Sequence, residues 1–201
     1  LLHTAMLAAD DNRESDARTA LEATLKLNPK SPTALRQLGE LELKANNNDK
    51  AAEYLKRARD VRPDDATAAY EEGQARIKIA DYAGARDALE ASLKSTPGQL
   101  QARLILGDVY LHLNDAKAAQ DQFEAAQLID GNNTEAQVGL AKAQIAGGDF
   151  AGAAQQLEAL ATSQPRNADV QAQLALAYDG LGKKAEAQAA RARAQALRVR
   201  K

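Results

Sequence analysis

The side chains that could do chemistry in this chain are few and widely separated. The two histidines, His3 and His112, lie in distant segments, and neither has an acidic residue at catalytic spacing that recurs with it. A single histidine on a helix is more often a surface or packing residue than a base or a metal ligand. The chain contains no cysteine, which excludes disulfides, zinc–thiolate sites and thiol catalysis. We therefore predict no catalytic, cofactor-binding or metal-ligating residue, and no enzyme activity.

Three short polar segments resemble ligand loops but lack the required spacing. Residues 147–149 (Gly-Gly-Asp) lack the spaced glycines and the following lysine of a phosphate loop. The aspartate pairs at 10–11 and 64–65 lack the alternating carboxylates of a calcium loop. All three fall where a helix is expected to begin or end, so they are interpreted as turns and helix caps. Residues 132–134 match a glycosylation sequon, which matters only in a eukaryotic secreted protein.

The composition indicates which elements must carry these residues. Aromatic residues make up 3% of the chain and charged residues 27%, with a net charge of −2. Alanine, leucine, glutamine, lysine and arginine dominate, and these residues favour helices over strands. With so few large side chains, the core must consist of helices that pack closely through small residues. We predict an all-α protein, with no apolar run long enough to cross a bilayer.

A 34-residue period runs through the whole sequence. Alanine recurs without a gap at Ala17, Ala51, Ala85, Ala119, Ala153 and Ala187. Four residues after each alanine stands a larger side chain, with one exception at the end: Leu21, Leu55, Leu89, Phe123, Leu157 and Arg191. Twelve residues after the alanine the chain usually has proline: Pro29, Pro63, Pro97, Gly131, Pro165 and Val199. Self-similarity at such a period is the signature of a repeat architecture.

The centre of the best-matching repeat contains Leu106-Gly107, Tyr110, Ala119 and Phe123. This pattern resembles the tetratricopeptide repeat, a helix–turn–helix unit of 34 residues. The resemblance implies a right-handed α-solenoid of stacked antiparallel helix pairs in one domain, residues 1–201. We expect about six repeats, with a C-terminal cap in the last: a partial one at 1–31, then 32–65, 66–99, 100–133, 134–167 and 168–201. The departures are the absence of tryptophan, Gly131 in place of proline, and Glu72 in an apolar position.

The physical chemistry of one repeat explains the spacing. Asp115 ends the first helix of repeat 100–133 and can cap the second, and Asp81 and Asp149 have the same phase. Gly107 and Ala119 are small because the two helices cross closely there, so a bulky residue would overpack the contact. Glu72 breaks the apolar pattern of repeat 66–99, so the helix packing of that repeat is the part of the assignment that the sequence supports least. In the turns, the segment 46–49 supplies asparagines that tolerate left-handed backbone and cap a helix, and Ser31-Pro32 starts the next repeat.

The two ends of the chain differ in character. Leu1 already lies inside the phase of a first helix, so we expect further sequence before it. Residues 183–201 include seven basic residues and one acidic residue. Basic clusters can bind nucleic acid, but no aromatic residue is interleaved here for base stacking. We interpret this segment as a solvated cap, with no nucleic-acid partner, and we note that open solenoid ends can stack into a homo-oligomer.

The resemblance also implies where a partner would bind. In similar proteins the first helices of successive repeats line a concave groove that holds a peptide. The corresponding residues of this chain are Arg36, Glu40, Lys44, Tyr70, Gln74, Lys78, Leu104, Asp108, Leu111, Val138, Lys142 and Ile145. One apolar row repeats along this face, and its side chains either anchor a partner or pack between neighbouring helices: Leu43, Ile77, Leu111 and Ile145.

The function expected from this resemblance is a scaffold for a protein or peptide partner. Some members of the family clamp a C-terminal carboxylate with lysine, asparagine and arginine. On the corresponding surface of this chain, acidic Glu40 and Glu71 accompany Arg36 and Lys44, and there is no asparagine. This surface therefore argues against a C-terminal carboxylate as the ligand. Two alternatives remain: a domain of a bacterial secretion, polysaccharide-export or envelope-assembly protein, or the regulatory fragment of a larger enzyme. The regular, alanine-rich repeats favour the bacterial periplasm or cell envelope over the cytoplasm.

Overall fold

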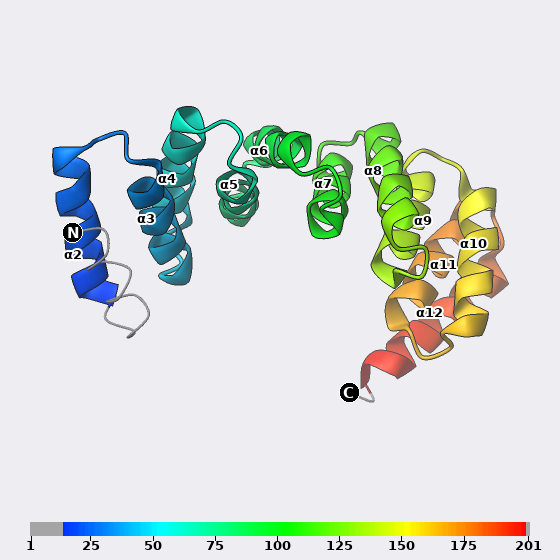
Figure 1. The fold of residues 1–201 in the computed structure, drawn as a ribbon. Helices are drawn as coiled ribbons and strands as arrows, with labels where there is room; N and C mark the ends of the chain where they lie inside the picture. Colours follow the sequence, from blue (N-terminus) through cyan, green and yellow to red (C-terminus); the bar gives the residue numbers. More distant parts are fainter. Residues whose placement is uncertain (1–13, 200–201) are drawn as a thin grey trace. The chain divides into compact units, whose positions relative to one another are not determined.

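The computed structural model describes residues 14–199, and within that range all regular structure is α-helical (Figure 1). The helices are α2 (Glu14–Leu27), α3 (Pro32–Lys44), α4 (Asn48–Val61), α5 (Ala66–Lys78), α6 (Tyr82–Ser95), α7 (Leu100–His112), α8 (Ala116–Ile129), α9 (Thr134–Ala146), α10 (Phe150–Ser163), α11 (Ala168–Gly180) and α12 (Lys184–Val199). Their bounds repeat every 34 residues, as predicted. Part of the partial repeat 1–31, with His3 and the first aspartate pair, lies outside the described residues, as do residues 200–201.

The described residues form two compact blocks, an N-terminal and a C-terminal one, which divide between Ala102 and Arg103. In the N-terminal block each helix from α2 to α6 contacts the next, and α3 also contacts α5. In the C-terminal block the same holds from α8 to α12, and α9 also contacts α11. Contact between consecutive helices, and between alternate first helices, is the packing of stacked helix pairs. Each block is therefore built as an α-solenoid.

A left-handed residue closes the first helix of each repeat from 32–65 to 168–201. The residues with positive φ recur at the repeat spacing: Asn46 (58°), Ala80 (59°), Asn114 (60°), Gly148 (84°) and Gly182 (73°). The next amide then reaches back to a carbonyl five residues earlier, as from Asp81 N to Arg76 O at 2.9 Å. This is a Schellman termination, which satisfies carbonyls that the helix leaves free. The left-handed asparagine predicted in the segment 46–49 is confirmed at Asn46.

Helix caps occur at the predicted phase, with one exception. The side chains of Asp81, Asp115 and Asp149 accept hydrogen bonds of 3.0, 3.0 and 2.9 Å from amides in the first turn of the second helices. Ser31 caps α3 ahead of its N-terminal proline. The asparagine before α4, Asn47, makes no side-chain cap hydrogen bond. Its Nδ2 instead donates a hydrogen bond of 2.7 Å to the buried carboxylate of Glu42, which orients the amide.

Small residues lie where the paired helices cross, as predicted. A Cβ built on Gly107 would lie 2.6 Å from Cζ of Phe123, which is buried. Gly73 faces Leu89 in the same way, at 2.7 Å. On its other side Phe123 also meets Gly139 of α9, which leaves no room for a side chain there. One aromatic ring is thus held between two glycines of the C-terminal block.

Repeat 66–99 accommodates Glu72 through a network of ion pairs. Its side chain is fully buried, but its two oxygens accept hydrogen bonds of 2.7 Å from Nε of Arg59 and Nε of Arg76. Arg76 also pairs with Asp81, the cap of α6. Burying a charge is tolerated when it is paired and hydrogen-bonded. The ion network therefore replaces the apolar contact of the other repeats, and α5 contacts both α4 and α6.

The last helix carries the polar exception found in the sequence. Arg191 stands where the other repeats have leucine or phenylalanine, and its side chain is 56% exposed and pairs with Asp179 of α11. A solvated arginine at this position suits the predicted cap, which stays a prediction. No helix within residues 14–199 has the length and apolar character needed to cross a membrane.

Candidate partner-binding surface

The predicted surface of the N-terminal block lies on the first helices α3 and α5. Arg36 and Glu40 form an ion pair one turn apart on α3. On α5, Nε2 of Gln74 donates a hydrogen bond of 3.1 Å to the hydroxyl of Tyr70, one turn earlier. Both pairs are partly buried, so their side chains are held in place rather than extended into solvent. We call this set the α3–α5 surface.

Two lysines complete the α3–α5 surface. Lys44 is the last residue of α3 and Lys78 the last residue of α5, and both are exposed. A cation at a helix C-terminus is stabilised by the helix dipole. The two positions are one repeat apart, so α3 and α5 each present an ammonium group to solvent at the same end.

Glu71 is the unusual residue of the α3–α5 surface. Its Oε2 atom is buried and accepts no hydrogen bond from the described residues. Burial raises the pKa of Glu71 to about 7, and the neighbouring carboxylate of Glu40 raises it further while Arg36 opposes the change. Sequence analysis noted Glu71 only as a source of repulsion. Its burial depends on how α3 and α5 pack, which its acidic character alone does not reveal.

The surface of the C-terminal block has a different chemistry. Asp108 on α7 is partly buried, and this burial raises its pKa, while Lys142 on α9 and His112 on α7 act in the opposite direction. Lys142 lies one repeat beyond Asp108, on the next first helix. The pair Asp108 and Lys142 therefore brings opposite charges together across neighbouring repeats.

The apolar residues predicted for this surface are more buried than a docking face requires. Leu104 and Val138 are 1% and 6% exposed, so they belong to the core and we leave them out of the surface. Leu111 and Ile145 are half-buried, and Ile145 packs against the core cluster that includes Leu157.

The repeated apolar row has the same partly buried character in the N-terminal block. Leu43 packs against the cluster around Leu55, and Ile77 is half-buried. Packing between helices thus accounts for Leu43, as it does for Ile145. The exposed parts of the row stay available to a partner.

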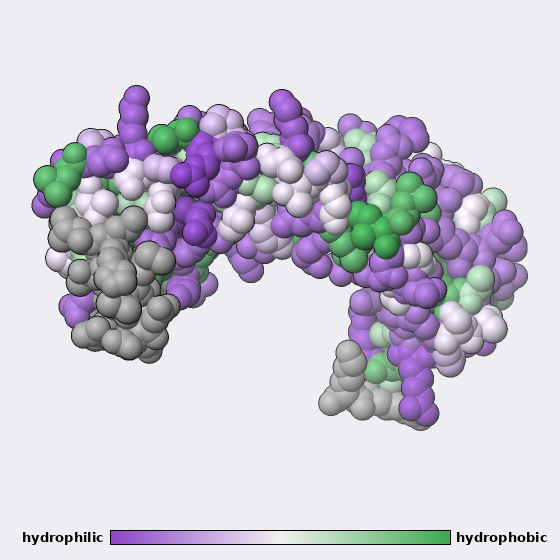
Figure 2. All heavy atoms as spheres, in the orientation of Figure 1, coloured by the Kyte–Doolittle hydropathy of each residue, from purple (hydrophilic) through white to green (hydrophobic). Residues whose placement is uncertain are grey.

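On the face drawn in Figure 2, hydrophilic atoms predominate and hydrophobic atoms gather in separate groups. The most exposed large apolar side chains are Leu128, at 89%, and Val199, at 80%. Scattered apolar residues of this kind are normal on a protein surface.

Comparison with known proteins decides the family. Family models described as tetratricopeptide repeat match residues 4–66, 36–78, 70–134 and 135–167. These matches cover most of the chain. The chain belongs to the tetratricopeptide-repeat family. Proteins of this family are typically interaction scaffolds. The comparison with curated protein sequences finds no match.

Solved structures share the tetratricopeptide-repeat fold at low sequence identity. YrrB, described as a tetratricopeptide-repeat protein with an unusual peptide-binding site, is 21% identical, covers 89% of this chain and 92% of its own, and has a TM-score of 0.72. A tetratricopeptide-repeat protein from Parabacteroides merdae ATCC 43184 is 18% identical over 94% of this chain and 75% of its own, with a TM-score of 0.76. MamA residues 41 to the end, from Desulfovibrio magneticus RS-1, are 18% identical over 85% and 96%, with a TM-score of 0.75. These likenesses support the fold.

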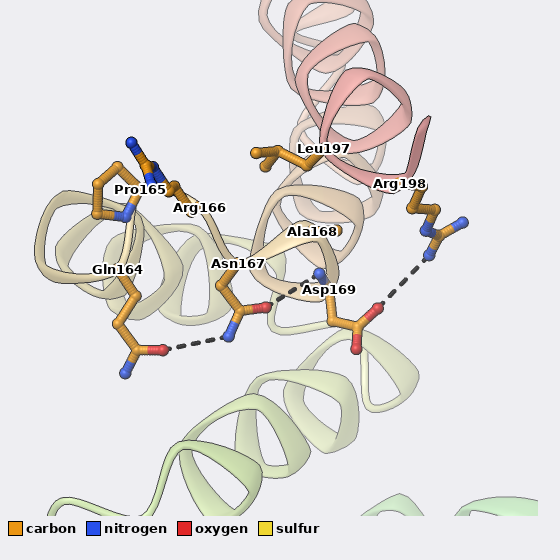
Figure 3. A pocket seen from close by; sticks show the side chains of 8 residues that line it. All are labelled: Gln164, Pro165, Arg166, Asn167, Ala168, Asp169, Leu197 and Arg198. Carbon is orange, nitrogen blue, oxygen red and sulfur yellow. Dashed lines mark hydrogen bonds and ion pairs between the residues drawn. The ribbon is translucent and has the colours of Figure 1, made fainter. Parts of the chain in front are cut away.

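The last tetratricopeptide repeat borders a cavity of about 720 Å³ (Figure 3). Its lining mixes polar side chains with Pro165, Ala168 and Leu197, and Nη2 of Arg198 reaches Asp169 at 3.5 Å. Asn167 caps α11 and donates from its amide to Gln164 at 3.1 Å. Arg166 points away from Asp169 and Arg198, so the two arginines do not converge on one ligand (Figure 3). The cavity therefore lacks the arrangement of an anion site.

The described tetratricopeptide repeats contain no group of three histidine or acidic side chains placed to hold a metal ion. One polar cluster that sequence reasoning missed is the Glu72 network, which packs the repeats. A signal for it was present, because Arg76 follows Glu72 by one helical turn and such pairs attract. Arg59, thirteen residues earlier, carried no such signal.

Proposed function

We propose that this chain is a scaffold that binds a protein or peptide partner on the first-helix surfaces of its repeats, and that it performs no chemical reaction itself. The observation that carries the proposal is the α3–α5 surface. Lys44 and Lys78 are exposed there, and the fixed pairs beside them present polar groups at regular spacing. Held side chains lose little conformational freedom on binding, which favours recognition.

The C-terminal block carries its own proposed surface. Asp108 and Lys142 supply opposite charges, and the exposed edges of Leu111 and Ile145 supply apolar contact. YrrB, which has the same fold, is described as having a peptide-binding site, and this supports a peptide as one class of partner. An affinity near micromolar, roughly −8 kcal/mol, is typical of such recognition.

The proposal is tested by capture from a native lysate with the wild type and three variants of the full chain. One variant carries Lys44→Ala and Lys78→Ala, and a second carries Leu111→Ser and Ile145→Ser. The matched control is Leu128→Ser, which makes the same replacement on a second helix at a position 89% exposed. Thermal unfolding of each form shows whether a loss of capture reflects a loss of folding.

We expect a partner that the wild type and Leu128→Ser both retain, and that at least one surface variant releases while still folded. Equal capture by all forms would refute the proposed surface. A chemical reaction catalysed by the purified chain would refute the scaffold role.

A further inference from the structure

We propose that the α3–α5 surface contains a proton switch, in which Glu71 and Glu40 share a hydrogen bond when Glu71 is protonated and repel each other when it is not. The two residues lie on different first helices, Glu71 on α5 and Glu40 on α3, and these helices are in contact. The switch stands independently of the proposed function.

The first argument is the count of charges at the contact. Two carboxyl groups meet one guanidinium group, that of Arg36, and Arg36 is already paired with Glu40 on its own helix. Oε2 of Glu71 is buried and receives no hydrogen bond from the described residues. A buried oxygen without a donor is expensive as an anion and far less so as a protonated acid. The geometry therefore favours the neutral form of Glu71.

The second argument is that no other charge near Glu71 reverses this preference. Asp65, the cap of α5, adds further negative charge. From the neighbouring helices, Arg59 of α4 is bound to Glu72, and Asp81 before α6 is bound to Arg76. Both groups are thus committed within the Glu72 network. Among the described groups that act on Glu71, Arg36 is the cation that opposes its neutral form.

The third argument comes from the repeat itself. Gln37 occupies the position one repeat before Glu71, and its Oε1 atom is likewise buried without a hydrogen bond from the described residues. A neutral amide has nearly the shape of a protonated carboxyl group. The fold thus already accepts a neutral side chain at this position, which makes Gln the appropriate replacement for Glu71.

Titration supports what the geometry shows. Burial raises the pKa of Glu71 from 4.5 to about 7, with Glu40 contributing in the same direction. Loss of the proton then adds one negative charge to the surface near neutral pH. If the α3–α5 surface binds a partner, as proposed above, its affinity for charged partners changes over the same pH range. This consequence rests on the proposed function.

The sign of the effect on stability follows from linkage. Because the pKa of Glu71 is higher in the folded state, the folded chain binds more protons than the unfolded chain between about pH 4.5 and about pH 7. The wild type must lose stability relative to Glu71→Gln as the pH rises through that window, and the difference must become constant above it. One proton corresponds to at most a tenfold change in the unfolding constant per pH unit.

The experiment uses the full chain and needs no partner. Carboxyl ¹³C NMR follows the titration of Glu71 and Glu40 in the wild type, assigned with Glu71→Gln and Glu40→Gln. Urea unfolding of wild type, Glu71→Gln and Glu53→Gln is measured from about pH 4 to about pH 8. Glu53 is an exposed carboxylate of the same block, so its variant is the matched control.

We expect a Glu71 midpoint near neutral pH that falls in Glu40→Gln, together with the predicted loss of relative stability. Glu53→Gln should run parallel to the wild type. A Glu71 midpoint in the ordinary carboxyl range overturns the switch, even if Glu71→Gln fails to fold, because that measurement uses the wild type. A midpoint unchanged by Glu40→Gln overturns the shared hydrogen bond. Since these measurements involve no partner, they can fail while the scaffold proposal stands, and the reverse is also true.

Discussion

The carboxylate of Glu72 on α5 accepts a hydrogen bond of 2.7 Å from Nε of Arg59 on the preceding helix, although Glu72 is fully buried and Arg59 is not. Arg76 completes the arrangement from one turn further along α5. The side chains of the two arginines keep about a fifth of their surface exposed, at 22% and 18%. The network thus joins an interior charge to groups that still reach solvent.

Removing the anion from this network should destabilise the chain. Glu72→Ala leaves two guanidinium groups without their buried partner, and we expect a cost of about 3 to 5 kcal/mol in urea unfolding. The triple variant Arg59→Leu, Glu72→Leu, Arg76→Tyr copies the residues found one repeat later. It should recover most or all of that loss, because an apolar replacement of a buried ion network is often neutral or stabilising. A triple variant no better than Glu72→Ala would contradict the account.

The left-handed conformation of Ala80 predicts a stabilising substitution. A non-glycine residue at φ 59° is strained by its Cβ, and glycine removes that strain. Ala80→Gly should raise stability by up to about 1 kcal/mol, since glycine also costs entropy in the unfolded chain. The reverse change at the same repeat position, Gly148→Ala, should lower it by a similar amount. Thermal unfolding measures both, and a loss in Ala80→Gly would show that the turn is not strained.

The contact of Gly107 with Phe123 predicts coupling between two substitutions. Gly107→Ala places a methyl group against the ring, and we expect a cost of about 1 to 3 kcal/mol. Repeat 134–167 has the alternative solution, Ala141 with Leu157 at the same positions. The double variant Gly107→Ala, Phe123→Leu should therefore cost less than the sum of the single changes. A double-mutant cycle in urea measures the coupling, and strict additivity would argue against direct contact.

The cap at Asp81 predicts a specific dependence on acid. The amide of Gly84 lowers the pKa of Asp81 by donating to it; burial opposes this, and Arg76 adds to the lowering. Asp81→Asn keeps the cap but loses the ion pair, so the wild type should be the more stable near neutral pH. Because the folded pKa is lowered, this advantage must disappear as the pH falls through the acid range below about 4. Asp115→Asn is the control, because the repeat of Asp115 has a tyrosine at the position of Arg76. Its effect on stability should depend less on pH.

The sequence predicted the features that depend on local residues and regular spacing. The helix bounds, the caps at Asp115 and Asp149, and the crossing at Gly107 depend on contacts that repeat every 34 residues or lie within one hairpin. The burial of Glu72 could not be predicted in this way, because it depends on Arg59 in another helix. The burial of Leu104 and Val138 could not be predicted either, since an apolar residue on a first helix can face either solvent or the next repeat, and periodicity alone does not distinguish them.

The Schellman turns have a consequence for how such a chain can be lengthened or shortened. Each turn is closed by main-chain atoms around one left-handed residue, from Asn46 to Gly182. Removing or duplicating a segment between equivalent points of two turns joins backbone of the same conformation on both sides of the cut. Genetic recombination at these points therefore yields a chain with one hairpin fewer or more and no new type of junction.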